Sequence, residues 1–203
     1  HKSDQLFHVQ VDSWSPDEPY NEPNEAPEQL TYMDAKALHD AGKAYRQVVS
    51  FKSGRVVQPD GDDQRPFRVD GRATTNEFFA MFDVPFAYGS AWDRAADLAE
   101  ERVVVLSWEI NEQLYGGEDS VGKMLTLNGE TFRIAGVLEY WNPVPKFYDL
   151  NNNPYEESEG LYFPFSLGIS AETGSSGNTN CWKPVGDGGF EAFLASECVW
   201  IQM

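Results

Sequence analysis

The sequence predicts an α+β fold in which short capped helices alternate with strands. Residues 102–138 read as a strand, a helix and a two-stranded hairpin in direct succession. Residues 30–42 carry the start and stop signals of a helix. Hydrophobic residues make up 41% of the chain and aromatic residues 14%, which indicates a packed protein rather than a disordered acidic chain.

The first third of the chain contains three predicted strands. Residues 5–14 alternate in polarity and are predicted to form a strand, which a loop with four prolines at residues 16–28 interrupts. Residues 45–51 and 65–74 are predicted strands on either side of a polar turn.

Two capping boxes mark predicted helix starts in the same region. Thr31-x-x-Asp34 opens a helix that ends at Gly42, a natural C-terminal stop. Thr74-x-x-Glu77 opens a second, shorter helix.

The middle of the chain gives the clearest local signals. Residues 93–101 are predicted to form a short helix or a connecting loop before the strand at residues 102–106. Ser107 is the predicted N-cap of a helix that Gly116 and Gly117 end. Asn128-Gly129 joins two strands, because both central residues of a type I′ turn need a positive φ.

Residues 139–198 are rich in Asn, Gly and Ser, with one clear strand at 160–165 and a second at 198–203. Loops of this length are usually functional or held by a disulfide. Cys181 and Cys198 could form that disulfide, which would contribute about 3 kcal/mol, or remain two buried free thiols.

Residues 117–124 nearly match the phosphate-binding pattern G-x-x-x-x-G-K-[ST]. Met124 stands where a hydroxyl would hold Mg²⁺, and a helix precedes the glycines where a strand should. The segment is therefore predicted to be a turn entering a hairpin, and no nucleotide cofactor is expected.

The charge balance excludes several partners. With 15 Lys and Arg against 33 Asp and Glu, the formal charge is −18, which repels nucleic acids and anionic lipids. No apolar run of about 18 residues could span a bilayer, and no signal peptide is recognisable.

Two other groups of acidic residues are candidate sites that the sequence does not favour. Asp60, Asp62 and Asp63 could bind Ca²⁺, but they lack the bidentate Glu of an EF-hand, so a solvated turn is favoured. Glu139 and Glu159 could form a carboxylate pair for sugar chemistry, although nothing in the sequence fixes their separation. A secreted or periplasmic carbohydrate-binding or hydrolytic module is the alternative function, and no catalytic residue or metal ligand is assigned.

Four segments together resemble the MacB-like periplasmic core domain of ABC transporter permeases, the MacB/FtsX type. They are residues 72–82, 88–92, 103–107 and 121–137, in the family's order and spacing. The motif residues that match are Phe78, Phe79, Gly89, Ser107, Gly122, Lys123, Gly129, Gly136 and Val137. Ser90 and Trp92 replace the family's Arg and Phe, which affects packing only.

The resemblance implies two subdomains. An α/β porter-like part would begin at residues 1–90, a β-rich Sabre-like part would span residues 91–197, and a strand at 198–203 would return toward the porter-like part. That strand would then lie beside the N-terminal strand.

The resemblance also implies a function without catalysis in this domain. The domain would lie on the periplasmic side of the bacterial inner membrane and couple ATP hydrolysis to substrate export or release by mechanical transmission. Its partners would be the membrane helices of the same chain, a cytoplasmic ATPase, a second copy in a dimer, and a periplasmic adaptor or substrate.

Overall fold

The fold is a mixed α and β structure, as predicted. The computed structural model describes residues 6–10, 29–60, 64–181, 189–195 and 197–203. The strands are β1 Ser50–Gln58, β2 Phe67–Thr74, β3 Phe86–Gly89, β4 Val103–Leu106, β5 Met124–Leu127, β6 Glu130–Leu138, β7 Leu161–Pro164, β8 Asn180–Cys181 and β9 Cys198–Val199. The helices are α1 Tyr32–Ala41, α2 Glu77–Met81, α3 Arg94–Leu98, α4 Trp108–Tyr115, α5 Phe165–Ser170 and α6 Glu191–Leu194.

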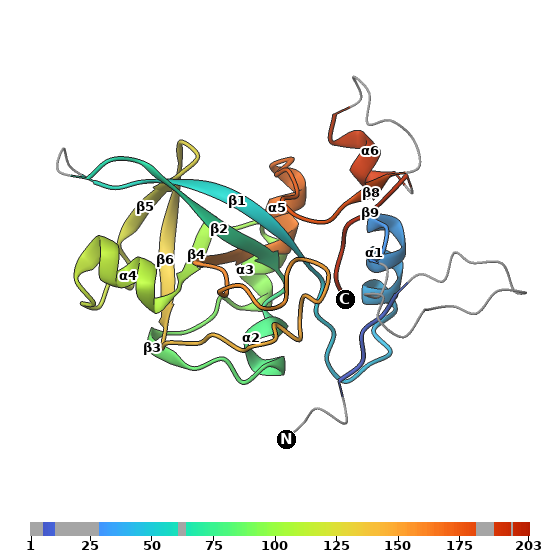
Figure 1. Cartoon of the computed structure of the whole chain (residues 1–203), viewed down its shortest axis with the longest axis horizontal. Helices are drawn as coiled ribbons and strands as arrows, with labels where there is room; N and C mark the ends of the chain where they lie inside the picture. Colours follow the sequence, from blue (N-terminus) through green and yellow to red (C-terminus); the bar gives the residue numbers. More distant parts are fainter. Residues whose placement is uncertain (1–5, 11–28, 61–63, 182–188, 196) are drawn as a thin grey trace, which may run out of the picture.

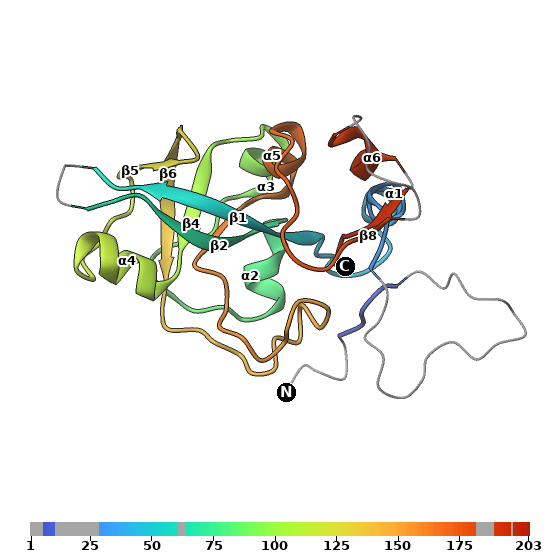
Figure 2. The ribbon, with the colours of Figure 1, turned by 45° about the horizontal axis from the view of Figure 1, so that its top comes forward.

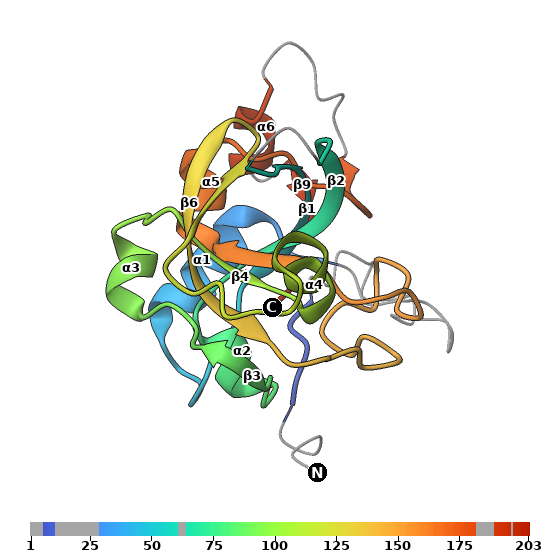
Figure 3. The ribbon, with the colours of Figure 1, turned by 90° about the vertical axis from the view of Figure 1, so that its left-hand side faces the viewer.

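Seven of the strands form one sheet that closes on itself. Its order is β3-β6-β4-β7-β2-β1-β5, and β5 pairs with β6 as well as with β1. Because β6 is long, residues 130–133 pair with β5 while residues 133–137 pair with β4. The result is a small barrel, whose curved strands are visible in Figure 1 and, from the α4 end, in Figure 3.

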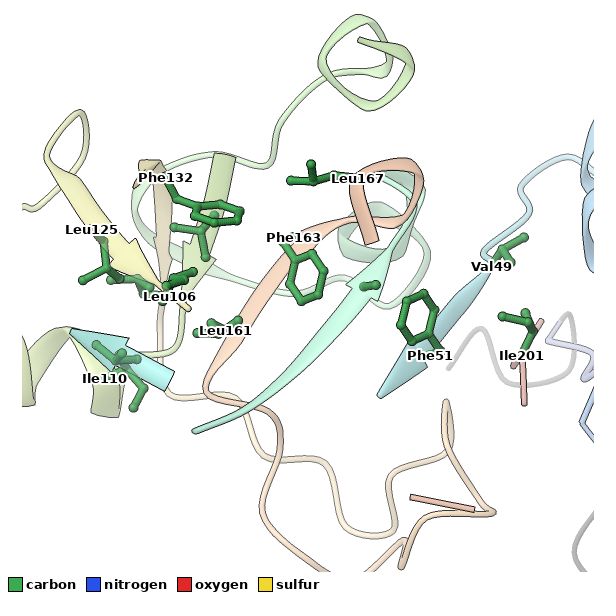
Figure 4. Packing of buried hydrophobic residues seen from close by; sticks show 14 of the residues in the cluster. Val49, Phe51, Leu106, Ile110, Leu125, Phe132, Leu161, Phe163, Leu167 and Ile201 are labelled. Atoms are coloured by element: carbon green, nitrogen blue, oxygen red, sulfur yellow. The ribbon is translucent and has the colours of Figure 1, made fainter. Parts of the chain in front are cut away.

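The hydrophobic core has one cluster on each face of this sheet. Val104 and Leu106 belong to the larger cluster, and Val103 and Val105 to the smaller, because successive strand side chains point to opposite faces. Figure 4 shows residues of the larger cluster, among them Phe51, Leu161 and Phe163. The smaller cluster lies outside the barrel and is mainly aromatic.

The predicted caps at α1 and α4 are confirmed. Thr31 Oγ1 accepts the backbone N–H of Asp34 at 3.1 Å and donates to the Asp34 carboxylate at 2.6 Å. Gly42 ends the helix with φ 58°. Ser107 Oγ accepts the N–H of Ile110 at 3.3 Å at the start of α4.

The hairpin at residues 124–138 is also confirmed. Asn128 and Gly129 have φ values of 51° and 83°. Leu127 pairs with Glu130 directly across the turn. Two positive φ angles are what a two-residue type I′ connection requires, so the turn residues set the register of β5 against β6.

Two strand predictions were wrong in their positions. Of the strand expected at residues 5–14, residues 6–10 form no strand, while residues 5 and 11–14 lie outside the described residues, as does the proline loop expected at 16–28. Strand β1 begins at Ser50 rather than at residue 45. Tyr45 is 95% exposed, so its side chain takes no part in a buried strand face.

The capping box at Thr74 was wrong as well. Thr74 is buried at the end of β2, where its hydroxyl donates to the Thr75 carbonyl at 3.4 Å. The helix α2 starts at Glu77 after Asn76, whose side chain makes no capping hydrogen bond. The pairing of β2 therefore decides the conformation of Thr74, and the local sequence signal does not.

The subdomain boundary expected at residue 90 does not fall at a break in the sheet. Strands β1 to β3 pair with β5, β6 and β7 from beyond that boundary. A smaller group of elements, α1, α6, β8 and β9, lies together at one end of the barrel (Figure 2).

The C-terminal segment lies beside earlier parts of the chain. Leu30 forms a bridge with Ile201, and Ser50 forms one with Gln202. The N–H of Val9 donates to the carbonyl of Met203 at 2.9 Å. Residues near the two ends of the described chain therefore lie side by side. Among the described residues, no helix has the length and apolar character needed to cross a membrane.

The small sheet of β8 and β9 carries a disulfide. The sulfur atoms of Cys181 and Cys198 are bonded, and the two residues lie opposite each other in the antiparallel pair. The bond links residues 17 positions apart and so closes the loop that contains α6.

Reduction of this disulfide should add about two mass units and lower stability. We expect the Cys181→Ala/Cys198→Ala variant to lose about 3 kcal/mol of unfolding free energy, because the unfolded chain regains the entropy of an open loop. Intact mass before and after reduction, together with urea denaturation, measures both effects. An unchanged mass would show that the thiols are free.

Asp97 is a buried acid at the junction of α2 and α3. Its carboxylate accepts the N–H of Asn76 at 3.1 Å, and the residue is 8% exposed. Burial raises the pKa of Asp97 to about 6, although hydrogen bonds from Asn76 and Trp92 act in the opposite direction.

Asp97 should therefore make the fold less stable as the pH rises from about 4 to 6. In this range the unfolded chain, with its ordinary aspartate pKa near 4, releases the proton before the folded state does. Asp97→Asn should gain stability relative to the parent between pH 4 and pH 7, by at most about 3 kcal/mol. Melting temperatures across this range provide the measurement. The exposed Asp60→Asn is the control, and an equal gain there would contradict the assignment.

Candidate functional site

The near-miss phosphate loop is a structural turn. The N–H of Gly122 donates to Ile134 at 2.8 Å, and that of Lys123 donates to Ser120 at 3.0 Å. The Lys123 ammonium lies 4.7 Å from the centre of the Tyr115 ring. The backbone N–H groups of Gly122 and Lys123 and the Lys123 ammonium thus have partners within the chain. This agrees with the prediction of a turn, which is made because a helix and not a strand precedes the glycines.

The most unusual feature of the molecule is a buried cation, Arg72, on the outer face of β2. Its guanidinium contacts the carboxylates of Asp149 and Glu159, the latter at 2.6 Å. It also donates to the Ser50 hydroxyl at 3.1 Å and lies 4.9 Å from the centre of the Tyr148 ring. Arg72, Asp149 and Glu159 are all at most 1% exposed. We call these three residues the Arg72 clamp.

The two carboxylates come from a long segment that folds back over the sheet. Residues 139–160 leave the end of β6, pass beside α2 and return to β7 (Figures 1 and 2). The N–H of Glu139 donates to Pro85 at 3.0 Å where the segment leaves, and the N–H of Gly160 donates to Asp70 at 2.9 Å where it returns. Asn152 holds Asp149 through its side-chain amide at 2.8 Å.

Arg72 and Glu159 each stabilise the ionised form of the other. Burial alone would raise the pKa of Glu159, but the adjacent Arg72 guanidinium holds that pKa below its usual value. Burial likewise opposes the charge on Arg72, yet Glu159 and Asp149 raise the pKa of Arg72 well above its usual value. Arg72 and Glu159 therefore form an ionised pair, and the Asp149 carboxylate contacts the same guanidinium.

The lowered pKa of Glu159 argues against Glu139 and Glu159 as a catalytic pair for sugar hydrolysis. A general acid at neutral pH needs a raised pKa, and that of Glu159 is lowered. Glu139 is exposed, whereas Glu159 is buried against Arg72. Glu159 therefore cannot serve as the general acid of this pair.

A cleft of about 740 Å³ borders the clamp. Its walls come from the ends of β2 and β6, the start of α4 and both ends of the segment 139–160. The acidic lining residues are Asp70, Glu109, Glu139, Glu156, Glu157 and Glu159, and the aromatic ones are Tyr140, Trp141 and Tyr162. This is the candidate functional site.

The solvated turn favoured over a calcium site at Asp60, Asp62 and Asp63 stays a prediction. Of these three residues, Asp60 is exposed, while Asp62 and Asp63 lie outside the described residues. Within the described ranges, no group of three or more His, Cys, Asp or Glu side chains could hold a metal ion.

Comparison with known families decides what kind of domain this is. The profile of the MacB-like periplasmic core domain matches residues 1–180. The chain belongs to this family.

Individual relatives agree with the assignment. The macrolide export ATP-binding/permease protein MacB of Rhodospirillum rubrum is 32% identical over 118 residues, which are 57% of this chain and only 18% of that protein. The periplasmic region of MacB from Actinobacillus actinomycetemcomitans has a TM-score of 0.55 at 17% identity, covering 86% of this chain and 78% of that one. The extracellular domain of the noncanonic ABC-type transporter YknZ from Gram-positive bacteria has a TM-score of 0.53 at 15% identity, covering 87% and 73%. At these identities the two structures show the shared fold.

The chain is thus an extracytoplasmic domain of a MacB-type ABC permease, on the periplasmic or extracellular side of the membrane.

The MacB-like motif residues occupy turns and the core and do not form one site. Phe78 and Phe79 are buried in the aromatic cluster, and Gly89 pairs with Gly136 between β3 and β6. A Cβ at Gly89 would meet the Ala135 carbonyl at 2.4 Å, so the close approach of these strands requires glycine there. The others are the cap Ser107, the turn residues Gly122, Lys123 and Gly129, and the buried Val137.

The Arg72 clamp was missed from the sequence. In the sequence, Arg72 is only the first residue of the segment 72–82 that resembles the family, and no motif includes Asp149. Arg72 is separated from Asp149 by 77 positions in the sequence and from Glu159 by 87, and no local pattern marks such a pairing.

Removing the cation of the clamp should be far more costly than removing an exposed one. Arg72→Met leaves two buried carboxylates without a counter-charge, so we expect a loss of about 3–5 kcal/mol in urea denaturation. The control is Arg102→Met, since Arg102 pairs with Glu130 at 3.1 Å on the surface, and its loss should be at most about 1 kcal/mol.

A triple variant separates the charge effect from lost packing. Arg72→Met/Asp149→Asn/Glu159→Gln removes all three charges and should recover much of the stability that Arg72→Met loses. Equal losses for Arg72→Met and Arg102→Met would contradict the role given to the clamp.

Proposed function

We propose that this domain transmits mechanical changes in a MacB-type permease. In this proposal a cytoplasmic ATPase moves the membrane helices of the same permease chain, and the domain converts that movement into export or release of a substrate. Two copies would work together in the full transporter, in contact with a periplasmic adaptor or the substrate. Family membership supports the proposal, and the arrangement of the chain supplies the physical route.

The observation that carries the proposal is the meeting of the first and last segments of the described chain. Val9 bonds to Met203, Leu30 bridges to Ile201, and Ser50 bridges to Gln202. Backbone hydrogen bonds of this kind resist sliding, so a force on either segment also acts on the other. Ser50 is the first residue of β1, so the force reaches the barrel directly.

Side-chain packing also links the C-terminal segment to β1. Trp200 is fully buried, and its ring centre lies 4.7 Å from that of Phe51 in β1. Its indole N–H donates to the Phe193 carbonyl at 3.1 Å, which ties α6 to the same point. Close-packed interiors of this type pass on displacement because they compress little.

The test uses the full permease with its ATPase in lipid nanodiscs. Spin labels at Tyr45→Cys, where the native residue is 95% exposed, report the distance between the two copies. We expect the distance distribution to differ between the nucleotide-free and ATP-bound states, because coupling requires two arrangements that ATP distinguishes.

A label pair within one copy is the matched control. Tyr45→Cys with Tyr140→Cys places both labels at exposed positions of one domain, and their distance should stay the same when the domain moves as a unit. An unchanged distance between copies in a transporter that hydrolyses ATP and exports its substrate would refute mechanical transmission by this domain.

A further inference from the structure

The cleft beside the Arg72 clamp has a lining suited to one class of ligand. We propose that it binds an organic cation, an ammonium group joined to an apolar or aromatic body. The proposal does not depend on mechanical transmission, because binding can be measured on the 203-residue chain alone. The volume of about 740 Å³ lies within the range of small-molecule sites.

The first argument is the set of carboxylates that remain without a cation. Asp70 pairs with Lys52 at 2.8 Å, and Glu159 is neutralised by Arg72. In the part of the chain that the structure describes, no ion pair within 4 Å involves Glu109, Glu139 or Glu157. These three therefore attract a cation into the cleft.

The second argument is the aromatic wall between them. Trp141 stacks on Tyr148 with the ring centres 5.4 Å apart, which holds its indole ring in place. Tyr140, the preceding residue, is 70% exposed. Aromatic faces attract ammonium groups, and indole does so most strongly.

The third argument is an unpaired polar group at the wall. Tyr162 is fully buried and lines the cleft, and its hydroxyl makes no hydrogen bond of good geometry with the described residues. A buried hydroxyl without a partner is costly, and a ligand ammonium whose N–H donated to this oxygen would relieve that cost.

Arg68, the one basic residue in the lining, does not cancel this charge. Its guanidinium lies over the backbone of Gly54 in β1, within 2.7 Å of where a Cβ would stand on that glycine. The start of α4 is no anion site either, because Ser107 caps it and Glu109 lies in its first turn.

The test is titration of the chain at pH 7 with benzylammonium, the protonated form of benzylamine, followed by NMR chemical-shift mapping. We expect saturable shifts at residues 139–142 and 156–158, and binding that weakens as salt is raised. Benzyl alcohol and benzoate have the same ring without the cation and should bind at least fivefold more weakly. Tighter binding of maltose than of the cation would favour a sugar site and overturn the proposal.

Variants locate the site. Glu139→Gln/Glu157→Gln should weaken cation binding at least fivefold, whereas Glu118→Gln/Glu191→Gln, which makes the same change of net charge at exposed positions outside the cleft, should change it less than twofold. Equal weakening by both double variants would show diffuse attraction to an acidic surface and refute the site. Tyr140→Leu tests the aromatic wall independently and should also reduce affinity, since the residue is exposed and its loss leaves the core intact.

Discussion

The structure depends above all on one constraint, that a buried charge must be neutralised where it lies. Arg72 is fully buried on the outer face of β2, and an isolated guanidinium there would be prohibitively costly. Asp149 and Glu159 meet this requirement only if residues 139–160 fold back across the sheet. The requirement therefore determines the path of the longest irregular segment of the described chain. That path in turn creates the cleft.

Three kinds of contact hold residues 139–160 in place. Backbone hydrogen bonds fix its two ends at Pro85 and Asp70, the Arg72 clamp fixes its middle, and aromatic contacts between Trp141, Tyr148 and Phe78 fill the space between it and the sheet. An irregular segment with so many constraints acts as part of the barrel. A rigid barrel is also what mechanical transmission would need, because a deformable domain would absorb the movement that it receives.

Local signals in the sequence were sufficient wherever the structure is local. Asn128-Gly129 fixed the hairpin because only a few residues tolerate positive φ, and Thr31 and Ser107 marked helix starts because their hydroxyls satisfy free N–H groups. Thr74 carries the same kind of signal, yet pairing in β2 outweighed it. The closure of the barrel by β5, the Arg72 clamp and the cleft could not be predicted, because each joins residues far apart in sequence.

The distribution of acidic residues around the cleft also has a physical logic. Carboxylates that are buried, such as Asp149 and Glu159, are paired with Arg72, so their desolvation is offset within the fold. Glu109, Glu139 and Glu157 lie on the exposed rim, where water solvates them at little cost. A cation entering the cleft would thus meet charges that the fold has not already neutralised, beside an indole ring that the clamp segment holds in place. The clamp provides the shape of the site and the rim provides its charge, so each can change without loss of the other.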